Sequence, residues 1–334
     1  MSGPIQHGGG LAAASALYGG RIEDWLDLST GINPCPPDLP VIPMRAWHRL
    51  PDQERETAAR VAAQRFYRSR DRLPLPVPGT QSVIQLLPRL VPSGARVAVV
   101  SPTYGEYARA FTLAGLAVDA ISDLNEISKA HGLVVVVNPN NPDGRLHTPT
   151  ELRALAGDLA DRGGMLVVDE AFGDMLPDQS LAGDDSANLI VFRSFGKFFG
   201  LAGIRLGFVI AADEVAAQFS EWLGPWAVSG PALVLAERLM SSDTSLIAQQ
   251  IRSRALALQE ILSEAGFTVS GGTELFQLVE DARVGELYRH LCSHQILTRK
   301  FDYRPDWLRF GLAPDEAGDT RLREALRTFR SSSA

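Results

Sequence analysis

The feature that most limits the fold is a set of short, continuous apolar runs in the middle of the chain. Such runs are typical of strands covered on both faces of a sheet, whereas a half-exposed strand alternates. Stretches 106–114 and 150–162 between them favour helix, and Thr148, Pro149 and Glu151 mark the start of the second. The runs are Val97–Val100, Leu133–Val137, Met165–Val168, Leu189–Phe192 and Leu206–Ile210. This alternation predicts an α/β fold whose large domain has a mostly parallel sheet flanked by helices.

The pattern changes after about residue 230. Residues 231–265 favour helix, with a break at 241–243, and a further helix is expected over 284–293. Strand-like pieces lie around it, at 267–270, 275–279, 296–299 and 307–312. We therefore expect a smaller α+β C-terminal domain. The predicted division is an N-terminal arm near the active site and small domain (1–30), a large domain (31–230), and an interdomain helix with the small domain (231–334).

Charge and composition exclude several classes of protein. The net charge of −7 and the pI near 5.5 leave no basic excess to neutralise nucleic-acid phosphates. The longest aliphatic run, Leu133–Val137, is far shorter than a membrane span, and the first residues do not resemble a signal peptide. Cys35 and Cys292 fit no disulfide or metal pattern, so we expect free thiols and no metal. We predict a cytoplasmic protein without nucleic-acid or membrane partners.

Polar residues follow four of the apolar runs directly. The segments Ser101–Tyr104, Asn138–Gly144, Asp169–Phe172 and Arg193–Lys197 supply an aromatic ring, amides, a carboxylate and a lysine. In open α/β sheets, ligands bind beyond the carboxyl ends of the strands. We therefore expect these side chains to share one site.

Lys197 is the most informative of these residues. It follows a strongly apolar strand and precedes Phe198 and Phe199. An apolar setting disfavours the charged ammonium form, and a neutral amine can form a Schiff base with a carbonyl. Taken on its own, the residue fits an ordinary surface lysine after a strand better than a catalytic one.

Three segments together resemble a known family. Residues 194–207, SFGKFFGLAGIRLG, resemble the cofactor-lysine segment of pyridoxal-phosphate enzymes of the class I/II aminotransferase superfamily. Residues 141–144, NPDG, resemble that family's Asn-Pro-x-Gly turn, and residues 169–171, DEA, resemble its aspartate strand end. Their order and spacing also match, and the resemblance spans nearly the whole chain. It implies the fold of these transferases and pyridoxal 5′-phosphate as the cofactor.

The resemblance implies a role for each matching residue. Lys197 would bind the cofactor covalently and move protons at the substrate α-carbon, while Asp169 would pair with the protonated ring nitrogen. Asn141 would donate to the phenolate oxygen, and Tyr104 would stack on the ring or else is simply a core or rim tyrosine. Arg309 would bind the substrate α-carboxylate. The cofactor phosphate would be bound by Gly79, Thr80, Gln81, Ser194 and Arg205.

Three positions depart from the family pattern. Phe172 stands where many relatives have a tyrosine that contacts the phenolate oxygen, which leaves Asn141 as the main donor there. Gly196 stands where a serine often adds a phosphate contact. Leu50 stands where a tyrosine often reaches the cofactor of the partner subunit. The resemblance also implies a homodimer.

The N-terminal segment narrows the choice of reaction. His7-Gly8-Gly9 and residues 26–34, LDLSTGINP, are similar to the start of threonine-phosphate decarboxylases, which serve cobalamin biosynthesis. Histidinol-phosphate aminotransferases are the nearest alternative, and also take a phosphorylated substrate. A substrate with both a carboxylate and a phosphate needs two cationic pockets. Beside Arg309, we expect Arg299, His7, Gly8, Gly9 and Asn33 to contact substrate, although Arg299 could be a solvated strand-end residue and His7 part of a mobile arm.

Two other classes of protein, an esterase and a non-catalytic regulator, fit the sequence less well. His7-Gly8-Gly9-Gly10 resembles an esterase oxyanion loop, but the G-x-S-x-G elbow that an esterase needs is missing from the sequence. A non-catalytic regulator on the same fold usually carries an additional DNA-binding domain, for which this chain has no spare length or basic arm. A phosphorylated amino-acid substrate and a decarboxylase fit the sequence best, with an aminotransferase as the alternative.

Overall fold

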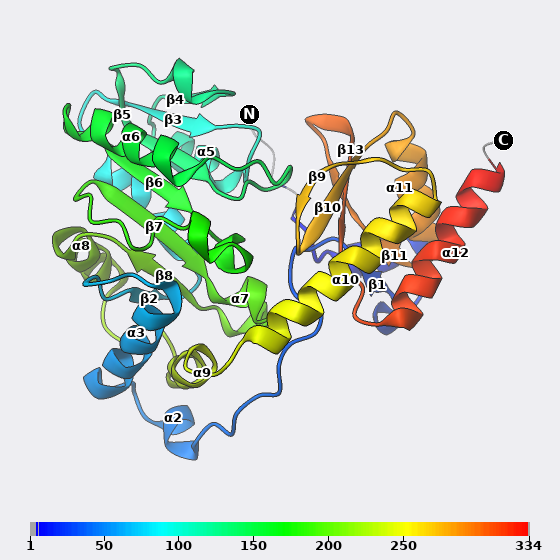
Figure 1. Cartoon of the computed structure of the whole chain (residues 1–334), viewed down its shortest axis with the longest axis horizontal. Coiled ribbons are helices and arrows are strands. Elements are labelled where there is room, and N and C mark those ends of the chain that lie inside the picture. The colour runs from blue at the N-terminus through cyan, green and yellow to red at the C-terminus, as the bar shows by residue number, and fades with distance from the viewer. Residues whose placement is uncertain (1–4, 6, 333–334) are drawn as a thin grey trace. The chain divides into compact units, whose positions relative to one another are not determined.

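The computed structural model describes residue 5 and residues 7–332, and the chain divides into two compact units. Unit 1 contains the residues up to Pro36, Pro142–Gly144 and the chain from Leu246 onward; unit 2 contains 37–141 and 145–245 (Figure 1). The boundaries near residues 30 and 230 that the sequence suggests remain predictions. Cys35 and Cys292 are both free thiols, as expected.

Unit 2 is built on a seven-stranded sheet with the order β2-β8-β7-β6-β5-β3-β4. Strands β7, β6, β5, β3 and β4 are parallel, whereas β8 pairs antiparallel with both β7 and β2. The sheet is therefore mixed but mostly parallel, and this prediction is confirmed. The strands are β2 (Leu75–Val77), β3 (Arg96–Val100), β4 (Val118–Ile121), β5 (His131–Val137), β6 (Met165–Asp169), β7 (Leu189–Ser194) and β8 (Gly207–Ile210).

The central strands of this sheet are buried on both faces, which explains their continuous apolar runs. Leu133–Val137, for example, have side chains pointing alternately to the two faces, and all five residues are buried. On one face, Val99 and Val135 pack in a single core with Phe111 of helix α5 and Phe219 of helix α8. Helices lie on both sides of the sheet (Figure 1).

Four helices of unit 2 lie between strands of this sheet, and one of them, α6, begins where the sequence has a helix start signal. In α6, the Thr148 side chain accepts from the Glu151 N–H while Glu151 accepts from the Thr148 N–H, which forms a capping box with proline in the first turn. The helices are α2 (Met44–His48), α3 (Gln53–Tyr67), α4 (Thr80–Ile84), α5 (Glu106–Leu113), α6 (Pro149–Ala160), α7 (Phe195–Phe198), α8 (Asp213–Leu223) and α9 (Gly230–Met240).

Unit 1 has a four-stranded antiparallel sheet, in the order β12-β13-β10-β9, and a short parallel pair of β1 with β11. Its strands are β1 (Leu26–Asp27), β9 (Val269–Thr273), β10 (Phe276–Glu280), β11 (Ile296–Leu297), β12 (Arg299–Phe301) and β13 (Arg304–Gly311). Its helices are α1 (Leu11–Tyr18), α11 (Val284–Ser293), α12 (Glu316–Ser332) and α10 (Ser245–Glu264), the last of which begins at the boundary residue. This α+β architecture agrees with the sequence.

Short 3₁₀ helices complete the two units. They span Ile22–Asp24, Leu87–Leu90, Leu124–Glu126, Gly173–Met175, Pro177–Gln179 and Ala202–Ile204. Three of them lie between a helix and a strand, and the other three lie between two successive strands.

Some elements differ from the sequence-based expectation. The strand expected over 296–299 is two strands, because residues 296–297 pair with β1 while residues 299–301 pair with β13. Strands β2 and β4 were not predicted: β2 contains Pro76 and is an edge strand, and β4 is an edge strand that includes Asp119. All three residues of β2 are buried, but the strand is short and its proline argues against a strand in the sequence, whereas β4 is only partly buried and has no continuous apolar run.

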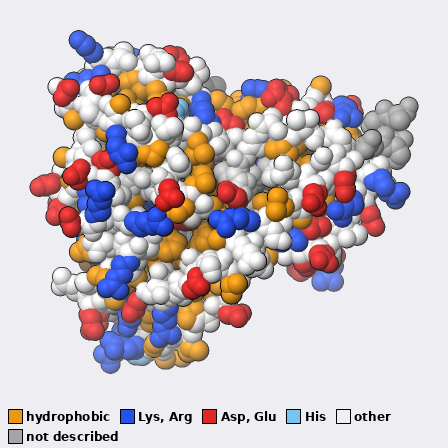
Figure 2. Space-filling model, in the orientation of Figure 1, with side chains coloured by type: hydrophobic (Ala, Val, Ile, Leu, Met, Phe, Trp, Pro, Cys, Tyr) orange, Lys and Arg blue, Asp and Glu red, His pale blue; other side chains and the backbone are white. Residues whose placement is uncertain are grey.

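The surface carries charges of both signs, and the face shown in Figure 2 has no large area of one sign. Among the helices of the described residues, none has both the length and the apolar character that crossing a membrane requires.

Candidate active site

A pocket in unit 2 lies where several strands of the large sheet end. All nine residues that the resemblance assigns to the cofactor line it: Gly79, Thr80, Gln81, Tyr104, Asn141, Asp169, Ser194, Lys197 and Arg205. Its other lining residues are Val137, Ala171, Phe172, Gly196, Ala202 and Leu206. The structure therefore gathers residues that are up to 127 positions apart, from Gly79 to Leu206, around one cavity.

Strand direction explains why these residues meet. Asp169 and Ser194 are the last residues of β6 and β7, and parallel strands end at the same edge of a sheet. Arg205 instead precedes β8, but β8 runs antiparallel to β7, so its first residues lie at that same edge. Gly79 follows β2, which is antiparallel to β8 in turn.

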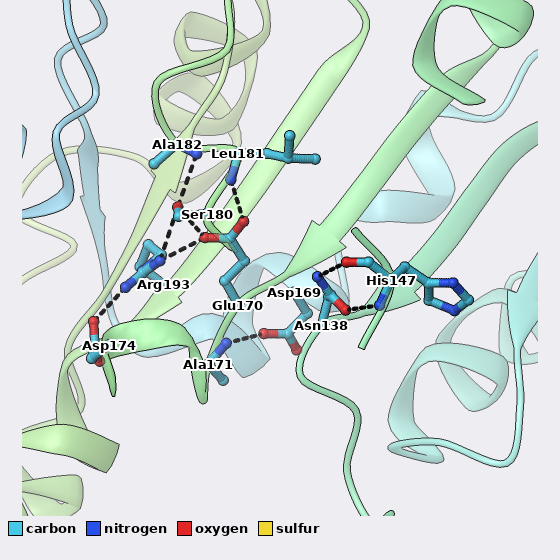
Figure 3. Close-up of polar contacts among 10 residues, drawn as sticks. All are labelled: Asn138, His147, Asp169, Glu170, Ala171, Asp174, Ser180, Leu181, Ala182 and Arg193. Atoms are coloured by element: carbon cyan, nitrogen blue, oxygen red, sulfur yellow. Dashed lines mark hydrogen bonds and ion pairs between the residues drawn. The ribbon is translucent and has the colours of Figure 1, made fainter. Parts of the chain in front are cut away.

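Buried amides fix the loops that carry Tyr104 and Asn141. The Asn138 side chain donates to the His147 carbonyl at 3.0 Å and accepts from the His147 N–H at 2.8 Å, which closes the loop after β5 (Figure 3). Asn140 donates to the Pro102 carbonyl at 2.9 Å and accepts from the Thr103 hydroxyl at 2.6 Å. The loops after β3 and β5 are thereby held together.

Asp169 is a buried carboxylate with a hydrogen-bond donor on each oxygen. Oδ2 accepts from the Tyr107 hydroxyl at 2.7 Å, and Oδ1 accepts from the Ala171 N–H at 3.0 Å. Burial raises the pKa of Asp169, while these two donors and the charge of Lys197 act in the opposite direction. Tyr107 was missed at the sequence level, where it reads as an apolar-face residue of the helix after β3.

Lys197 has the apolar surroundings that the sequence suggests. It lies in α7 between buried phenylalanines, of which Phe195 and Phe199 are stacked with ring centroids 4.5 Å apart. Its Nζ lies 5.4 Å from the ring centroid of Phe172. The residue that replaces the family's tyrosine therefore presents an aromatic face to the lysine amine.

Gly79 is required on two grounds. Its φ is +74°, a backbone conformation that residues other than glycine rarely adopt. A Cβ at this position would also lie 2.7 Å from Nη2 of Arg205. The Arg205 guanidinium therefore packs directly on the glycine backbone. Together with Thr80 and Ser194, these residues form a basic, hydroxyl-rich end of the pocket.

A hydrogen-bonded chain holds Tyr104. Its hydroxyl donates to Oε1 of Gln81 at 3.0 Å, and Nε2 of Gln81 donates to Oε2 of Glu106 at 2.9 Å. Glu106 is a buried acceptor that the sequence did not single out. The side chain of Gln81 therefore orients Tyr104. The sequence-based prediction concerns a different part of Gln81, its backbone N–H, which it assigns to the cofactor phosphate.

The structure bears on two of the positions that depart from the family pattern, Gly196 and Leu50. A Cβ at Gly196 would lie 2.7 Å from Cα of Ala202, so a serine would push against backbone and does not fit without a shift. Leu50 is 65% exposed and lies outside the lining of this pocket.

A buried ionic cluster, which the sequence did not reveal, lies behind the loop that follows Asp169. Arg193, at the end of β7, contacts Glu170 at 2.6 Å and Asp174 at 2.5 Å, and all three side chains are at most 4% exposed. Ser180 and the Leu181 N–H donate to Glu170 as well (Figure 3). The sequence signal that could have indicated this cluster is the position of its charged residues close after the apolar runs 165–168 and 189–192.

In unit 1, the two arginines expected to bind substrate lie on neighbouring strands. Arg299 of β12 is in register with Arg309 of β13. Arg309 is buried and donates to the Ser29 carbonyl at 3.0 Å. Burial, and then the charge of Arg299, lower the pKa of Arg309 to about 10. The two guanidinium groups repel each other, and an anion bound beside them would reduce that repulsion.

The glycines of the N-terminal segment pack on the same residue, Ser29. The Gly9 N–H donates to the Ser29 hydroxyl at 2.7 Å, and a Cβ at Gly8 would lie 2.4 Å from the Ser29 carbonyl oxygen. His7 is exposed. Asn33 is buried, and its side-chain oxygen accepts from the Cys35 N–H at 2.9 Å. Ser29 thus links Gly8 and Gly9 to Arg309, while Asn33 stabilises a turn.

Comparison with known proteins gives the family. Residues 25–326 match the family model for aminotransferase class I and II. The chain is 60% identical over 328 residues to a threonine-phosphate decarboxylase of Sinorhizobium sp. and 44% identical over 331 residues to one of Pseudomonas aeruginosa; both alignments cover 98% of each chain. The crystal structure of histidinol-phosphate aminotransferase from Sinorhizobium meliloti, in complex with pyridoxal-5′-phosphate, has a TM-score of 0.82 at 20% identity, covering 100% of this chain and 96% of that chain.

The chain therefore belongs to the class I and II aminotransferase family, as the three sequence segments indicate, and the predicted fold class is confirmed.

Replacing Arg193 with methionine should strongly destabilise the protein. The change leaves Glu170 and Asp174 buried without their cation, and breaking a buried ion pair in this way costs about 3–5 kcal/mol. Burial raises the pKa of Asp174 and the charge of Arg193 opposes that rise, so without Arg193 the folded-state pKa of Asp174 would be higher still. A carboxyl whose pKa is raised by folding costs stability when it ionises, so the variant would lose stability as pH rises above about 4. Thermal unfolding should show a deficit that is largest near pH 7 and smaller near pH 4.5.

The matched control is Arg68→Met, which breaks an ion pair with Asp178 in which both side chains are mostly exposed. Such a pair contributes less than about 1 kcal/mol. Equal melting temperatures for Arg193→Met and Arg68→Met at pH 7 would contradict the importance of the buried cluster.

Proposed function

We propose that this protein is a pyridoxal-phosphate-dependent decarboxylase that converts L-threonine O-3-phosphate to (R)-1-amino-2-propanol O-2-phosphate in cobalamin biosynthesis. The observation that carries the proposal is the near-full-length similarity to two threonine-phosphate decarboxylases. The pocket supports it, because its residues suit the cofactor that such an enzyme needs.

The pocket fits pyridoxal phosphate in both shape and chemistry. Arg205, Ser194 and Thr80 offer a cation and hydroxyl donors for a phosphate, next to a glycine whose missing side chain leaves room for Arg205. Asp169 offers a buried carboxylate for a protonated ring nitrogen, and Asn141 offers an amide for the phenolate oxygen.

When bound, the cofactor supplies an aldehyde and an electron-accepting ring. Lys197 would hold it covalently and carry a proton to the substrate α-carbon. Asp169 would keep a negative charge beside the ring nitrogen, and the Tyr104 ring, fixed by Gln81, would limit the tilt of the cofactor.

The substrate would be bound through its two anionic groups. We assign the α-carboxylate to Arg309, whose guanidinium can form two parallel hydrogen bonds, and the phosphate to Arg299. His7, the backbone of Gly8 and Gly9, and Asn33 are the further candidates for substrate contact. Fixing both ends would orient the bond between the α-carbon and the carboxylate, so that carbon dioxide leaves and a proton replaces it on the α-carbon.

The alternative reaction is transamination of a phosphorylated substrate, as in histidinol-phosphate aminotransferases. The two reactions differ in their requirement for a second substrate. Decarboxylation returns the cofactor to its starting form, whereas transamination stops after one half-reaction until a keto acid arrives.

Incubating the purified enzyme with threonine phosphate and no keto acid therefore tests the proposal. We expect sustained release of carbon dioxide over many turnovers and accumulation of the amino-propanol phosphate. The variant Lys197→Ala should be inactive, whereas Lys129→Ala, at an exposed lysine, should retain activity. No carbon dioxide, together with turnover of histidinol phosphate and 2-oxoglutarate, would show that the protein is an aminotransferase.

We also propose that the protein acts as a homodimer in the cytoplasm. The support is an exposed apolar surface on unit 2, formed by Leu39, Val41, Met44, Trp47 and Leu50, with Trp47 60% and Val41 82% exposed. Hydrophobic and basic side chains lie together over α2, at the lower edge of the view in Figure 2. Several large apolar side chains exposed close together are typical of a protein–protein interface.

Charged substitutions within this surface should dissociate the dimer. The double variant Trp47→Glu, Leu50→Glu places two carboxylates in the apolar area, whereas the control Leu113→Glu changes an equally exposed leucine elsewhere on unit 2. Light scattering should give a dimer for the wild type and the control and a 36.2 kDa monomer for the double variant. A fully active wild-type monomer would contradict the proposal.

A further inference from the structure

Tyr107 connects two residues of the pocket without lining it. Its hydroxyl donates to Oδ2 of Asp169 at 2.7 Å, and its ring packs edge-to-face on that of Tyr104, with centroids 6.3 Å apart and planes at 80°. Tyr104 and Asp169 both line the pocket, while Tyr107 lies outside its lining. Tyr107 is fully buried. Any effect that it has on a bound group must therefore pass through its two neighbours.

The hydrogen bond matters because the Asp169 carboxylate is in an environment that disfavours its charge. Only 4% of Asp169 is exposed, and burial raises its pKa. Of the effects that lower the pKa of Asp169, the hydrogen bond from Tyr107 is the largest, followed by the Ala171 N–H and then the charge of Lys197, while Glu170 acts in the opposite direction. Without the Tyr107 hydroxyl, the pKa of Asp169 would be higher and its ionised form less favoured.

Tyr107 itself is suited to be a permanent donor rather than an acid or base. Burial, and then the charge of Asp169, raise the pKa of Tyr107 well above its usual value. The hydroxyl is therefore held in its protonated, donating form. With donors on both oxygens, the carboxylate plane is also fixed in orientation.

We propose that Tyr107 is a positioning residue that keeps Asp169 ionised and correctly oriented, and so determines whether the cofactor's ring nitrogen carries a proton. This inference rests on the proposed function, because it concerns pyridoxal phosphate bound in the pocket. One proton is shared between the carboxylate and the ring nitrogen. Removing the Tyr107 hydroxyl moves that proton toward Asp169 and leaves both partners neutral.

The test is Tyr107→Phe, which keeps the ring that packs on Tyr104 and removes only the hydroxyl. Wild type and variant are reconstituted with pyridoxal phosphate labelled with ¹⁵N in the ring, and the ¹⁵N chemical shift is measured without substrate. We expect a shift typical of a protonated nitrogen in the wild type and a displacement toward the neutral value in the variant. With threonine phosphate, kcat should fall about 10- to 100-fold, with a much smaller change in KM.

The matched control is Tyr67→Phe. Tyr67 is another buried tyrosine of unit 2, and its ring packs on Phe208 and Arg193 rather than on the pocket. This variant should keep the wild-type ¹⁵N shift and a kcat within about twofold. If Tyr67→Phe changed the shift as much as Tyr107→Phe, the effect would reflect general packing and the inference would be wrong.

A rescue experiment separates the control of protonation from a structural defect. Pyridoxal phosphate methylated on the ring nitrogen is permanently cationic, so its charge does not depend on Asp169. Reconstituted with this analogue, wild type and Tyr107→Phe should have kcat values within about threefold of each other. A deficit as large as with the natural cofactor would overturn the inference.

A second variant keeps the inference testable if Tyr107→Phe folds poorly. Incorporating 3-fluorotyrosine at position 107 makes the hydroxyl a stronger donor while preserving the side chain. The ¹⁵N shift should then stay at the protonated value, and the proton should remain on the ring nitrogen to higher pH than in the wild type. Protonation that is lost at lower pH would contradict the inference.

The outcomes also separate this inference from the proposed function. If the wild type releases no carbon dioxide from threonine phosphate, the proposed reaction fails, but the ¹⁵N shifts still test Tyr107. If Asp169→Asn abolishes turnover while Tyr107→Phe has a wild-type shift and kcat, only the role of Tyr107 is wrong.

Discussion

The ion pairs of Arg193 with Glu170 and Asp174 are the constraint on which the candidate site depends. Glu170 directly follows Asp169 at the end of β6, and Arg193 directly precedes Ser194 at the end of β7. The cluster therefore joins the two strand ends that carry a buried carboxylate and the lysine turn. Because all three charges are buried, moving the loop would expose or unpair one of them, which is costly.

Charged groups are found both in the pocket of unit 2 and on the small sheet of unit 1. In unit 2, Arg205 and the hydroxyls of Thr80 and Ser194 line the same pocket as Asp169 and Lys197, to which we assign the cofactor ring nitrogen and the covalent link. In unit 1, Arg299 and Arg309 face each other across two strands, although like charges in register are unfavourable. An acidic chain that retains such a pair has local sites for anions, as a substrate with a carboxylate and a phosphate requires.

The sequence predicts the residues at the strand ends better than the residues that support them. Lys197, Asp169 and Asn141 follow apolar runs and match family segments, and all three line one pocket. Tyr107 carries no such signal, and although Arg193 follows an apolar run, the sequence does not show its partners. The roles of both residues arise from contacts with residues 62 and 23 positions away. The edge strands β2 and β4 lack the signal of a continuous aliphatic run as well, because β2 has only three residues, one of them proline, and β4 is only partly buried.

The most direct test of the central claim, that this pocket binds pyridoxal phosphate through Lys197, is reduction with borohydride followed by peptide mapping. The sequence makes the result decisive, because it contains only three lysines: Lys129, Lys197 and Lys300. The account predicts a phosphopyridoxyl group on the peptide that contains Lys197, and unmodified peptides for the other two lysines. Modification of Lys129 or Lys300 instead, or no bound cofactor after reconstitution, would contradict it.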